Sequence, residues 1–324
     1  MEGLLVRVIF KCFWWCVQKL PFRFPGLFII GIKRTGALGD VLLTTPIIRE
    51  LKKNHPKAFF WVQTDFKEVF VHHPDVDWIL SHGIEKGVSI LIDLDLAYEK
   101  KPNIHIVDAY SYAAIDRPLD NKRLFLFSSK RDLRKVSKVL KGKLNIYKDA
   151  YIVMHQAVSW DNRTWSKGYW EELTQAFISK GYKIAIVGRK KDFSQKEQGG
   201  VVNLHSKLTL SQIKELIHRS CLFVGTDSAL FHVAMATESP VVGLFTVANP
   251  ELRVTRKENT ISLIPKSSCR FCLHQQKAPV TRVDCVYGTD HCVKEITPQE
   301  VLAASQKLLS KKGANDFDFL QSPD

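Results

Sequence analysis

Short apolar runs alternate with amphipathic stretches through most of this chain, and this alternation constrains the fold more than any other feature. The runs have the length and the β-branched and aromatic content of buried strands, and stretches with helical periodicity lie between them. The predicted strands are LFIIGIK (27–33), AFFWVQT (58–64), VSILIDLDL (88–96), YIVMHQA (151–157), KIAIVG (183–188), CLFVG (221–225) and PVVGLF (240–245). Strand–helix alternation predicts parallel sheets with crossover helices, so the expected fold class is α/β.

The chain is long enough for two domains, since it has 324 residues. The strongest candidate boundary is the polar and basic stretch KVLKGKLNIYKDA (138–150), which separates two α/β halves of similar size. Two such halves suggest a cleft between them. We therefore predict an N-terminal segment (1–26), two α/β domains (27–145 and 146–308) and a loosely ordered tail (309–324).

The N-terminal segment contains no uncharged run long enough to span a membrane as a helix. On a helical wheel Arg7 and Lys11 lie on one narrow polar stripe, opposite a broad apolar face, and Trp14 and Trp15 flank the stripe. This pattern is typical of a helix that lies in the headgroup region of a membrane. The alternative is an ordinary helix packed on the protein's own surface.

The net charge is +14 and the isoelectric point is near 9.4, which favours an anionic partner. The sequence has no interleaving of aromatic and basic residues and no helix-turn-helix spacing, so nucleic acid is not the expected partner. We expect an anionic membrane surface or a phosphorylated substrate instead.

The turn RTGALGDVLL (34–43) follows the first predicted strand and ends on a carboxylate. Gly36 and Gly39 allow the backbone to approach a ligand closely. Asp40 then lies at the carboxyl edge of a parallel sheet, where open α/β sheets bind ligands. The alternative is that Asp40 only caps the next helix, although either of the two downstream threonines is an equally good cap.

The stretch VGTDSALFHVAMATESPVVGLF (224–245) predicts a strand, a helix and a second strand. Asp227 and Ser228 fall at the start of the helix, where free N–H groups attract phosphate. Ser228 and His232 are four residues apart, so both can face one ligand. The alternatives are that Asp227 caps the helix and that His232 is a buried core histidine.

The loop in MHQAVSWDNRTWSKGYWEEL (154–173) contains a cation, Arg163, next to an Asp-Asn turn. An arginine fixed there can hold a diphosphate through two hydrogen bonds, and Ser159 is a candidate to assist it. The alternative is an ordinary surface arginine beside a tryptophan.

Two further patterns indicate metal ions. Asp93 and Asp95 end a predicted strand with both carboxylates on one side, which suits a divalent cation bound to a diphosphate; strand-end acids are also common without any metal. The late cysteines form the pattern C-x2-C-x12-C-x6-C and are Cys269, Cys272, Cys285 and Cys292. Four thiolates at these spacings suit structural zinc or iron, and the alternative is four reduced thiols or an occasional disulfide.

Three of these stretches, in this order and spacing, resemble glycosyltransferase family 9, the ADP-heptose:lipopolysaccharide heptosyltransferases and their relatives. The resemblance covers roughly residues 28–300. It implies a GT-B architecture, in which two Rossmann-like domains face each other across a cleft. The N-terminal domain is then expected to bind the acceptor and the C-terminal domain the nucleotide-sugar donor.

The resemblance also implies roles for residues at matching positions. Asp40 matches the general base of the family and Arg163 matches the residue that holds the donor phosphates. The donor-binding turn is matched by Asp227, Ser228, Ala229 and His232. This sequence departs from the family at Ala229, where glycine is common, and in the absence of serines before the Gly39–Asp40 pair.

The function implied is an inverting glycosyl transfer that needs no catalytic metal. The expected donor is a nucleoside-diphosphate sugar, ADP-heptose first, and the expected acceptor is the lipopolysaccharide core or another lipid-linked glycan. The expected place is the cytoplasm, on the inner face of the cytoplasmic membrane. The alternatives are a non-catalytic nucleic-acid or membrane-binding protein of the same fold and a sugar-nucleotide epimerase.

Overall fold

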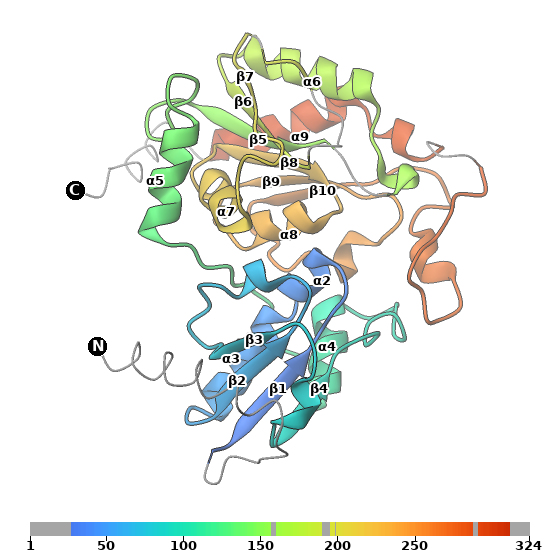
Figure 1. The fold of residues 1–324 in the computed structure, drawn as a ribbon. Helices are drawn as coiled ribbons and strands as arrows, with labels where there is room; N and C mark the ends of the chain where they lie inside the picture. Colours follow the sequence, from blue (N-terminus) through green and yellow to red (C-terminus); the bar gives the residue numbers. More distant parts are fainter. Residues whose placement is uncertain (1–26, 157–159, 190–194, 198, 288–290, 312–324) are drawn as a thin grey trace.

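A computed structural model describes residues 27–156, 160–189, 195–197, 199–287 and 291–311 (Figure 1). The predicted membrane-surface helix (1–26), Ser159 and most of the predicted tail lie outside the described residues. Within the described ranges, no helix is both long and apolar enough to cross a membrane.

The N-terminal sheet has four parallel strands in the order β3-β2-β1-β4. Their bounds are β1 (Ile29–Lys33), β2 (Phe59–Gln63), β3 (Trp78–Leu80) and β4 (Ile90–Asp93). The associated helices are α2 (Leu38–Leu42), α3 (Thr45–Asn54) and α4 (Ile106–Ile115), with 3₁₀ turns η1 (Lys67–Val69) and η2 (Ile84–Lys86). Helix α3 has its apolar side chains on one face, which it buries against α4 and the sheet.

The C-terminal sheet has six parallel strands in the order β7-β6-β5-β8-β9-β10. Its strands are β5 (Tyr151–His155), β6 (Lys183–Val187), β7 (Val201–Asn203), β8 (Leu222–Thr226), β9 (Val241–Leu244) and β10 (Thr260–Leu263). Its helices are α5 (Lys130–Val139), α6 (Lys167–Ile178), α7 (Leu210–His218), α8 (Ala229–Met235) and α9 (Pro298–Lys311), and its 3₁₀ turns are η3 (Asp161–Arg163), η4 (Pro250–Leu252), η5 (Cys272–Gln275) and η6 (Val293–Glu295).

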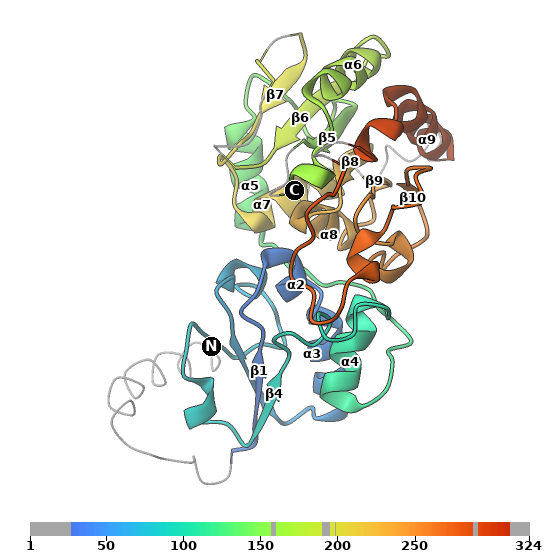
Figure 2. The same cartoon turned by 90° about the vertical axis from the view of Figure 1, so that its right-hand side faces the viewer.

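Helices cover both faces of the C-terminal sheet. α6 and α9 lie on one face, and α7 and α8 lie on the other with α5 packed against α7 (Figures 1 and 2). This is the doubly wound order of a Rossmann fold, in which ligands bind outside the carboxyl ends of the strands where the strand order reverses. Here the order reverses between β5 and β8, so the sheet itself indicates where a ligand binds.

The predicted α/β class with two parallel sheets is confirmed, and each of the seven predicted runs contains a strand. Three strands were not predicted: β3, β7 and β10. Each has only three or four residues, too few for an apolar period to stand out. Residues 309–311, assigned to the loosely ordered tail, belong to α9 instead, which continues to Lys311.

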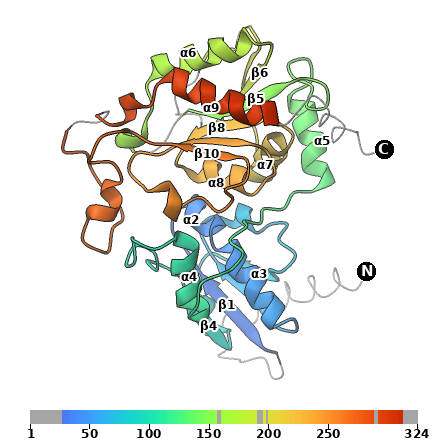
Figure 3. The same ribbon diagram turned by 180° about the vertical axis from the view of Figure 1, so that it is seen from behind.

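The two domains meet where α2 packs against α8 (Figure 1; Figure 3 shows the contact from behind). Val41 and Leu42 of α2 belong to the same buried apolar cluster as Phe231 and Val233 of α8. The carboxyl edges of the two sheets are therefore held together by one continuous core. This brings the turn at residue 34 next to the helix that begins at residue 229.

Candidate functional site

Asp40 lies in the first turn of α2, directly after β1, and does not cap that helix. The residue before the helix is Ala37, which makes no side-chain cap. Asp40 accepts from Nη2 of Arg34 at 2.9 Å, and the Tyr98 hydroxyl lies 3.4 Å from the same oxygen. The side chain is 19% exposed, so the carboxylate is within reach of a substrate. Thr44 does lie at the cap position of α3, but its side chain makes no capping hydrogen bond, because Thr44 and Thr45 both donate to carbonyls of α2.

Arg34 is a buried cation that the sequence reasoning did not single out. Its guanidinium donates to Glu99 at 2.8 Å and to the carbonyl of Leu94 at 3.2 Å, in addition to Asp40. It also lies over the rings of Tyr98 and Tyr110. Burial alone lowers the pKa of Arg34, but Tyr110, Asp40 and Glu99 outweigh burial, so the pKa is raised and the group stays charged.

The two glycines of the turn make room for neighbours. A Cβ on Gly36 would meet Nη2 of Arg34 at 3.0 Å, so this glycine leaves space for the buried guanidinium. A Cβ on Gly39 would meet the His232 ring at 3.1 Å and Cα of Ala229 at 3.3 Å. Gly39 therefore allows the close approach of the two domains, whereas the sequence suggested close approach of a ligand.

On the C-terminal side, Ser228 is the residue before α8 and lies beside β5. Its Oγ is 3.0 Å from Nδ1 of His155, the last residue of β5. This contact joins the carboxyl ends of β5 and β8, where the strand order reverses. The predicted donor turn is thus placed at the expected ligand edge of a Rossmann sheet.

Arg163 and Asp227 were both expected to bind the donor, and the structure places them in contact. Nη1 of Arg163 lies 3.4 Å from the Asp227 carboxylate and donates to the Asp227 carbonyl at 3.3 Å. The guanidinium also lies 3.9 Å from the ring centre of Trp160, which fixes its plane. Arg163 is only 18% exposed, so it is not an ordinary surface arginine.

His232 is buried, as the core alternative expected, and its Nδ1 has no partner within the described part of the chain. Its ring packs against Gly39 and edge-on against Phe231 at the domain contact. Burial lowers the pKa of His232 to about 4, and the charges of Asp227 and Asp40 only partly oppose that effect. The ring is therefore neutral at pH 7 and lies within electrostatic reach of both carboxylates.

Several buried polar atoms at this edge have no hydrogen-bond partner within the described part of the chain. They are both amide atoms of Gln156, Nε of Arg163, Oγ1 of Thr226 and Nδ1 of His232. A buried polar group left unsatisfied costs about 1 to 3 kcal/mol. At the carboxyl ends of β5 and β8 these atoms are therefore available to a polar ligand. Gln156 and Thr226 were missed in the sequence, where neither forms a pattern.

The strand-end acids Asp93 and Asp95 do not form the metal site considered from the sequence. Lys33 pairs with Asp93 at 3.0 Å and with Asp95 at 3.6 Å. Asp95 also accepts from the backbone and the hydroxyl of Thr35. The two carboxylates thus share one lysine, and Asp95 holds the turn that carries Asp40 through Thr35.

The four late cysteines, predicted to hold structural zinc or iron, gather in one loop region. Burial, and then Cys269, Cys285 and Cys272, raise the pKa of Cys292 to about 11. Burial likewise raises the pKa of Cys272. Among the described residues, no group of three or more histidines, cysteines or acids is placed to hold one metal ion.

The family model described as glycosyltransferase family 9 (heptosyltransferase) matches residues 80–281. Lipopolysaccharide heptosyltransferase 2 of Salmonella typhimurium is 28% identical over 163 residues, which are 47% of this chain and 44% of that protein. Lipopolysaccharide heptosyltransferase 2 of Escherichia coli is 27% identical over 164 residues, again 47% of this chain and 44% of that protein. The matches thus span less than half the length of these curated relatives.

Solved structures of similar proteins cover nearly the whole chain. The glycosyl transferase family 9 protein from Veillonella parvula has a TM-score of 0.73 at 17% identity and covers 90% of this chain and 100% of that one. ADP-heptose lps heptosyltransferase II of Escherichia coli has a TM-score of 0.67 at 16% identity, with 88% and 99% covered. The iron-containing dodecameric glycosyltransferase TibC of enterotoxigenic Escherichia coli has a TM-score of 0.68 at 16% identity, with 90% and 82% covered. At these identities the structures show a shared fold, the predicted GT-B architecture.

Proposed function

Because the chain belongs to glycosyltransferase family 9 (heptosyltransferase), we propose that it is an inverting glycosyltransferase that needs no catalytic metal. It moves a heptose from a nucleoside-diphosphate donor, ADP-heptose first, onto the lipopolysaccharide core or another lipid-linked glycan. The heptosyltransferases of Salmonella and Escherichia coli among its relatives support this choice of sugar and acceptor.

One observation carries the proposal: unsatisfied buried polar atoms line the carboxyl ends of β5 and β8, and Asp40 lies beyond the α2–α8 contact. Gln156, Thr226 and Nε of Arg163 supply donors and acceptors for a polar ligand. Free N–H groups at the start of α8 add partial positive charge next to Ser228. A nucleoside diphosphate carries negative charge and hydrogen-bonding groups that can pair with these atoms.

In the proposed reaction, Asp40 takes the proton of an acceptor hydroxyl while the hydroxyl oxygen bonds to the anomeric carbon of the donor sugar. The bond from that carbon to the diphosphate breaks, and the electron pair leaves with the diphosphate. Attack from the face opposite the leaving group inverts the anomeric centre. Arg34 and Tyr98 hold the carboxylate, so orientation rather than basicity is what Asp40 contributes first.

Arg163 is proposed to stabilise the charge that builds on the leaving diphosphate. Its Nη1 already contacts Asp227, while Nε is buried and has no partner in the described part of the chain. A phosphate oxygen that accepts from Nε satisfies this atom without breaking the contact to Asp227. Loss of one such preorganised donor typically costs about 3 to 4 kcal/mol of transition-state stabilisation.

We further propose that the protein works in the cytoplasm at the inner face of the cytoplasmic membrane, where a lipid-linked acceptor is within reach. The charge of +14 supports an anionic surface as its surroundings. The proposed chemistry uses no residue of the four-cysteine region.

A thermal-shift panel with ADP, UDP, GDP and CMP, on wild type and Arg163→Ala, tests the donor site. A ligand at 100 times its dissociation constant stabilises the folded state by about 2.7 kcal/mol. We expect a shift selective for ADP that weakens in Arg163→Ala. Absence of any nucleotide shift would favour the non-catalytic alternative, and isomerised donor formed without acceptor would favour the epimerase.

A further inference from the structure

The exposed charged side chains of helix α5 (Lys130–Val139) are all positive. Its exposed side chains include five cations, and a sixth follows in the next turn; the set is Lys130, Arg131, Arg134, Lys135, Lys138 and Lys141. At about 100° per residue, the five on the helix fall within an arc of about 140°. We call these six residues the α5 cationic face.

The opposite side of the helix is fully occupied. Leu133 and Val136 are buried against α7, and Asp132 is held by the capping box with Ser129. Asp132 also pairs with His72 of the N-terminal domain at 3.2 Å. The rotation of α5 is therefore fixed, and the cationic face is directed away from the protein.

The α5 cationic face has no internal counter-charge. Within the described ranges, none of its six members makes an ion pair. Elsewhere the surface does interleave signs, as in the pairs Arg49–Asp75 and Lys257–Glu251. On α5 the cations are instead consecutive along one face of a single helix.

This arrangement costs the isolated protein stability. Lys130 and Arg134 are like charges four residues apart, as are Arg131 and Lys135, and each such pair is destabilising. Lys130 and Arg131 also place positive charge at the positive end of the helix dipole. An anionic surface in contact with the face offsets both costs.

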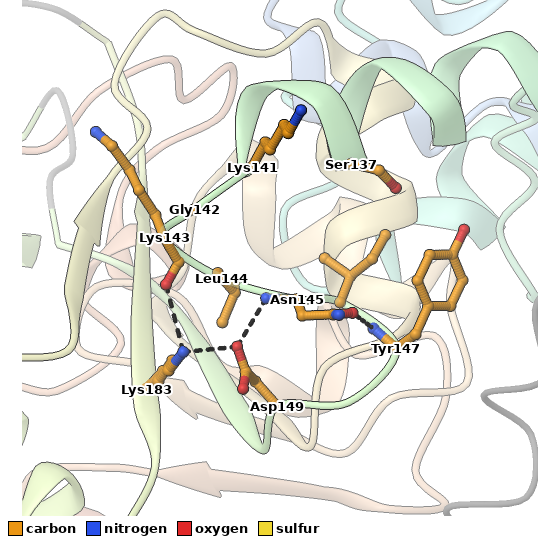
Figure 4. Close-up of a pocket in the computed structure, with 10 residues that line it drawn as sticks. Ser137, Lys141, Gly142, Lys143, Leu144, Asn145, Tyr147, Asp149 and Lys183 are labelled. Atoms are coloured by element: carbon orange, nitrogen blue, oxygen red, sulfur yellow. Dashed lines mark hydrogen bonds and ion pairs between the residues drawn. The ribbon is translucent and has the colours of Figure 1, made fainter.

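A neighbouring depression shows the contrast. It lies at the C-terminal end of α5 and has a volume of about 440 Å³, and its lining includes Lys141, Lys143, Asp149 and Lys183 (Figure 4). Inside it Lys183 pairs with Asp149 at 2.7 Å, and Lys143 pairs with Glu197 outside it. Lys141 points away from the Lys183–Asp149 pair (Figure 4). Lys183 and Lys143 of the depression are therefore paired with carboxylates, whereas the members of the α5 cationic face are not.

We propose that the α5 cationic face docks the protein on an anionic lipid bilayer by adsorption, without insertion. The apolar side of α5 is buried against α7, so the helix has no hydrophobic face left to enter the acyl region of the bilayer. The face has no aromatic side chain on which nucleic-acid bases stack, which favours a lipid surface over single-stranded nucleic acid. The docking is independent of glycosyl transfer and of the first 26 residues.

The test compares two charge-matched triple variants of the full chain. Arg131→Gln, Arg134→Gln and Lys138→Gln remove three charges from the face. Lys180→Gln, Lys307→Gln and Lys311→Gln remove three exposed charges from α9 and the end of α6, on the other face of the sheet (Figure 3). All six positions are exposed, so both variants are expected to unfold at the wild-type midpoint.

Co-sedimentation is measured with vesicles of equimolar phosphatidylglycerol and phosphatidylcholine, and with phosphatidylcholine alone. Each cation near an anionic surface contributes about 1 kcal/mol and 1.4 kcal/mol is tenfold, so the α5 variant should lose about 100-fold in partitioning onto the anionic vesicles at low salt. The control variant should lose much less, and rising salt should weaken wild-type binding. An equal loss in both variants, or unchanged vesicle binding together with loss of duplex DNA binding in the α5 variant, overturns the proposal.

Discussion

Nη2 of Arg34 lies 2.9 Å from Oδ2 of Asp40, so the proposed base is held in an ion pair with a buried arginine. The same nitrogen lies 2.8 Å from Glu99, which is 65 residues away from Arg34 in the chain. Arg34 therefore joins the turn that carries Asp40 to the segment after β4. Its removal leaves Asp40 and Glu99 without the cation that both contact.

Arg34→Met tests this relationship. Loss of one partner of a buried ion pair leaves an uncompensated charge, so we expect the free energy of unfolding to fall by about 3 to 5 kcal/mol in urea denaturation. Arg49→Met is the matched control, because Arg49 makes an exposed pair with Asp75 at 2.8 Å. That change should cost at most about 1 kcal/mol. If Arg34→Met and Arg49→Met lowered the free energy of unfolding equally, the burial of Arg34 would not contribute to stability as described.

Gly39→Ala tests the contact between the domains. The added Cβ meets the backbone of Ala229 at 3.3 Å and the His232 ring at 3.1 Å, so α2 and α8 have to separate by a few tenths of an ångström. We expect kcat/KM to fall at least tenfold, because Asp40 is the next residue and reaction rates depend on its placement. Gly168→Ala in α6 is the control, because its Cβ meets nothing within 4 Å. Wild-type kcat/KM in Gly39→Ala would contradict the account of this contact.

Three buried imidazoles predict loss of stability in mild acid. Burial lowers the pKa of His73, His105 and His232 to about 4. In the unfolded chain these histidines bind a proton near pH 6.5. Their contribution to the free energy of unfolding is therefore constant above neutral pH and falls between about pH 6.5 and 4. Each imidazole contributes up to about 2 kcal/mol between pH 7 and 5, by the relation of 1.36 kcal/mol per pKa unit.

Urea denaturation at pH 7 and pH 5 measures this effect. His73→Gln should reduce the difference between the two pH values, whereas His82→Gln, at an exposed position, should leave it unchanged. A pH difference that is identical in wild type and both variants would mean that His73 is protonated alike in the folded and unfolded states.

The cysteine region predicts a protected thiol. The pKa of Cys292 is about 11 because the thiol is buried and close to three other cysteines. Since the thiolate is the nucleophile, iodoacetamide should alkylate Cys292 about 100-fold more slowly in the folded than in the unfolded protein. Mass spectrometry of a time course measures the rates. Equal rates would contradict the burial, and protection that a chelator removes would show a bound metal instead.

Much of the fold was predictable because the strands that build the core are strongly apolar. β5 and β8 are buried along their whole length, and their sequences stand out in any window. The strand β7 was not predictable, since only three residues pair at the edge of the sheet and two of them are valines in a polar stretch. Local sequence carries little information about such short edge strands.

The site was predictable where one local stretch contains it and not where distant segments meet. Asp40, Arg163 and Asp227 each lie in a recognisable turn, and the structure places the last two in contact. The pairing of Arg34 with Glu99 depends on the tertiary fold, so no local pattern signals it. The role of Gly39 was misjudged for the same reason, because its neighbour Ala229 belongs to the other domain.

The most direct measurement of the central claim is heptose transfer from ADP-heptose to a lipopolysaccharide-core acceptor by wild type and Asp40→Asn. We predict transfer with inversion by wild type. Asp40→Asn should lose about 10² to 10⁴-fold in kcat, the range typical of general-base catalysis, while its thermal shift with ADP stays as in wild type. Transfer by Asp40→Asn at the wild-type rate would contradict the assignment of Asp40, and a wild type that binds ADP but transfers no sugar would contradict the proposed function.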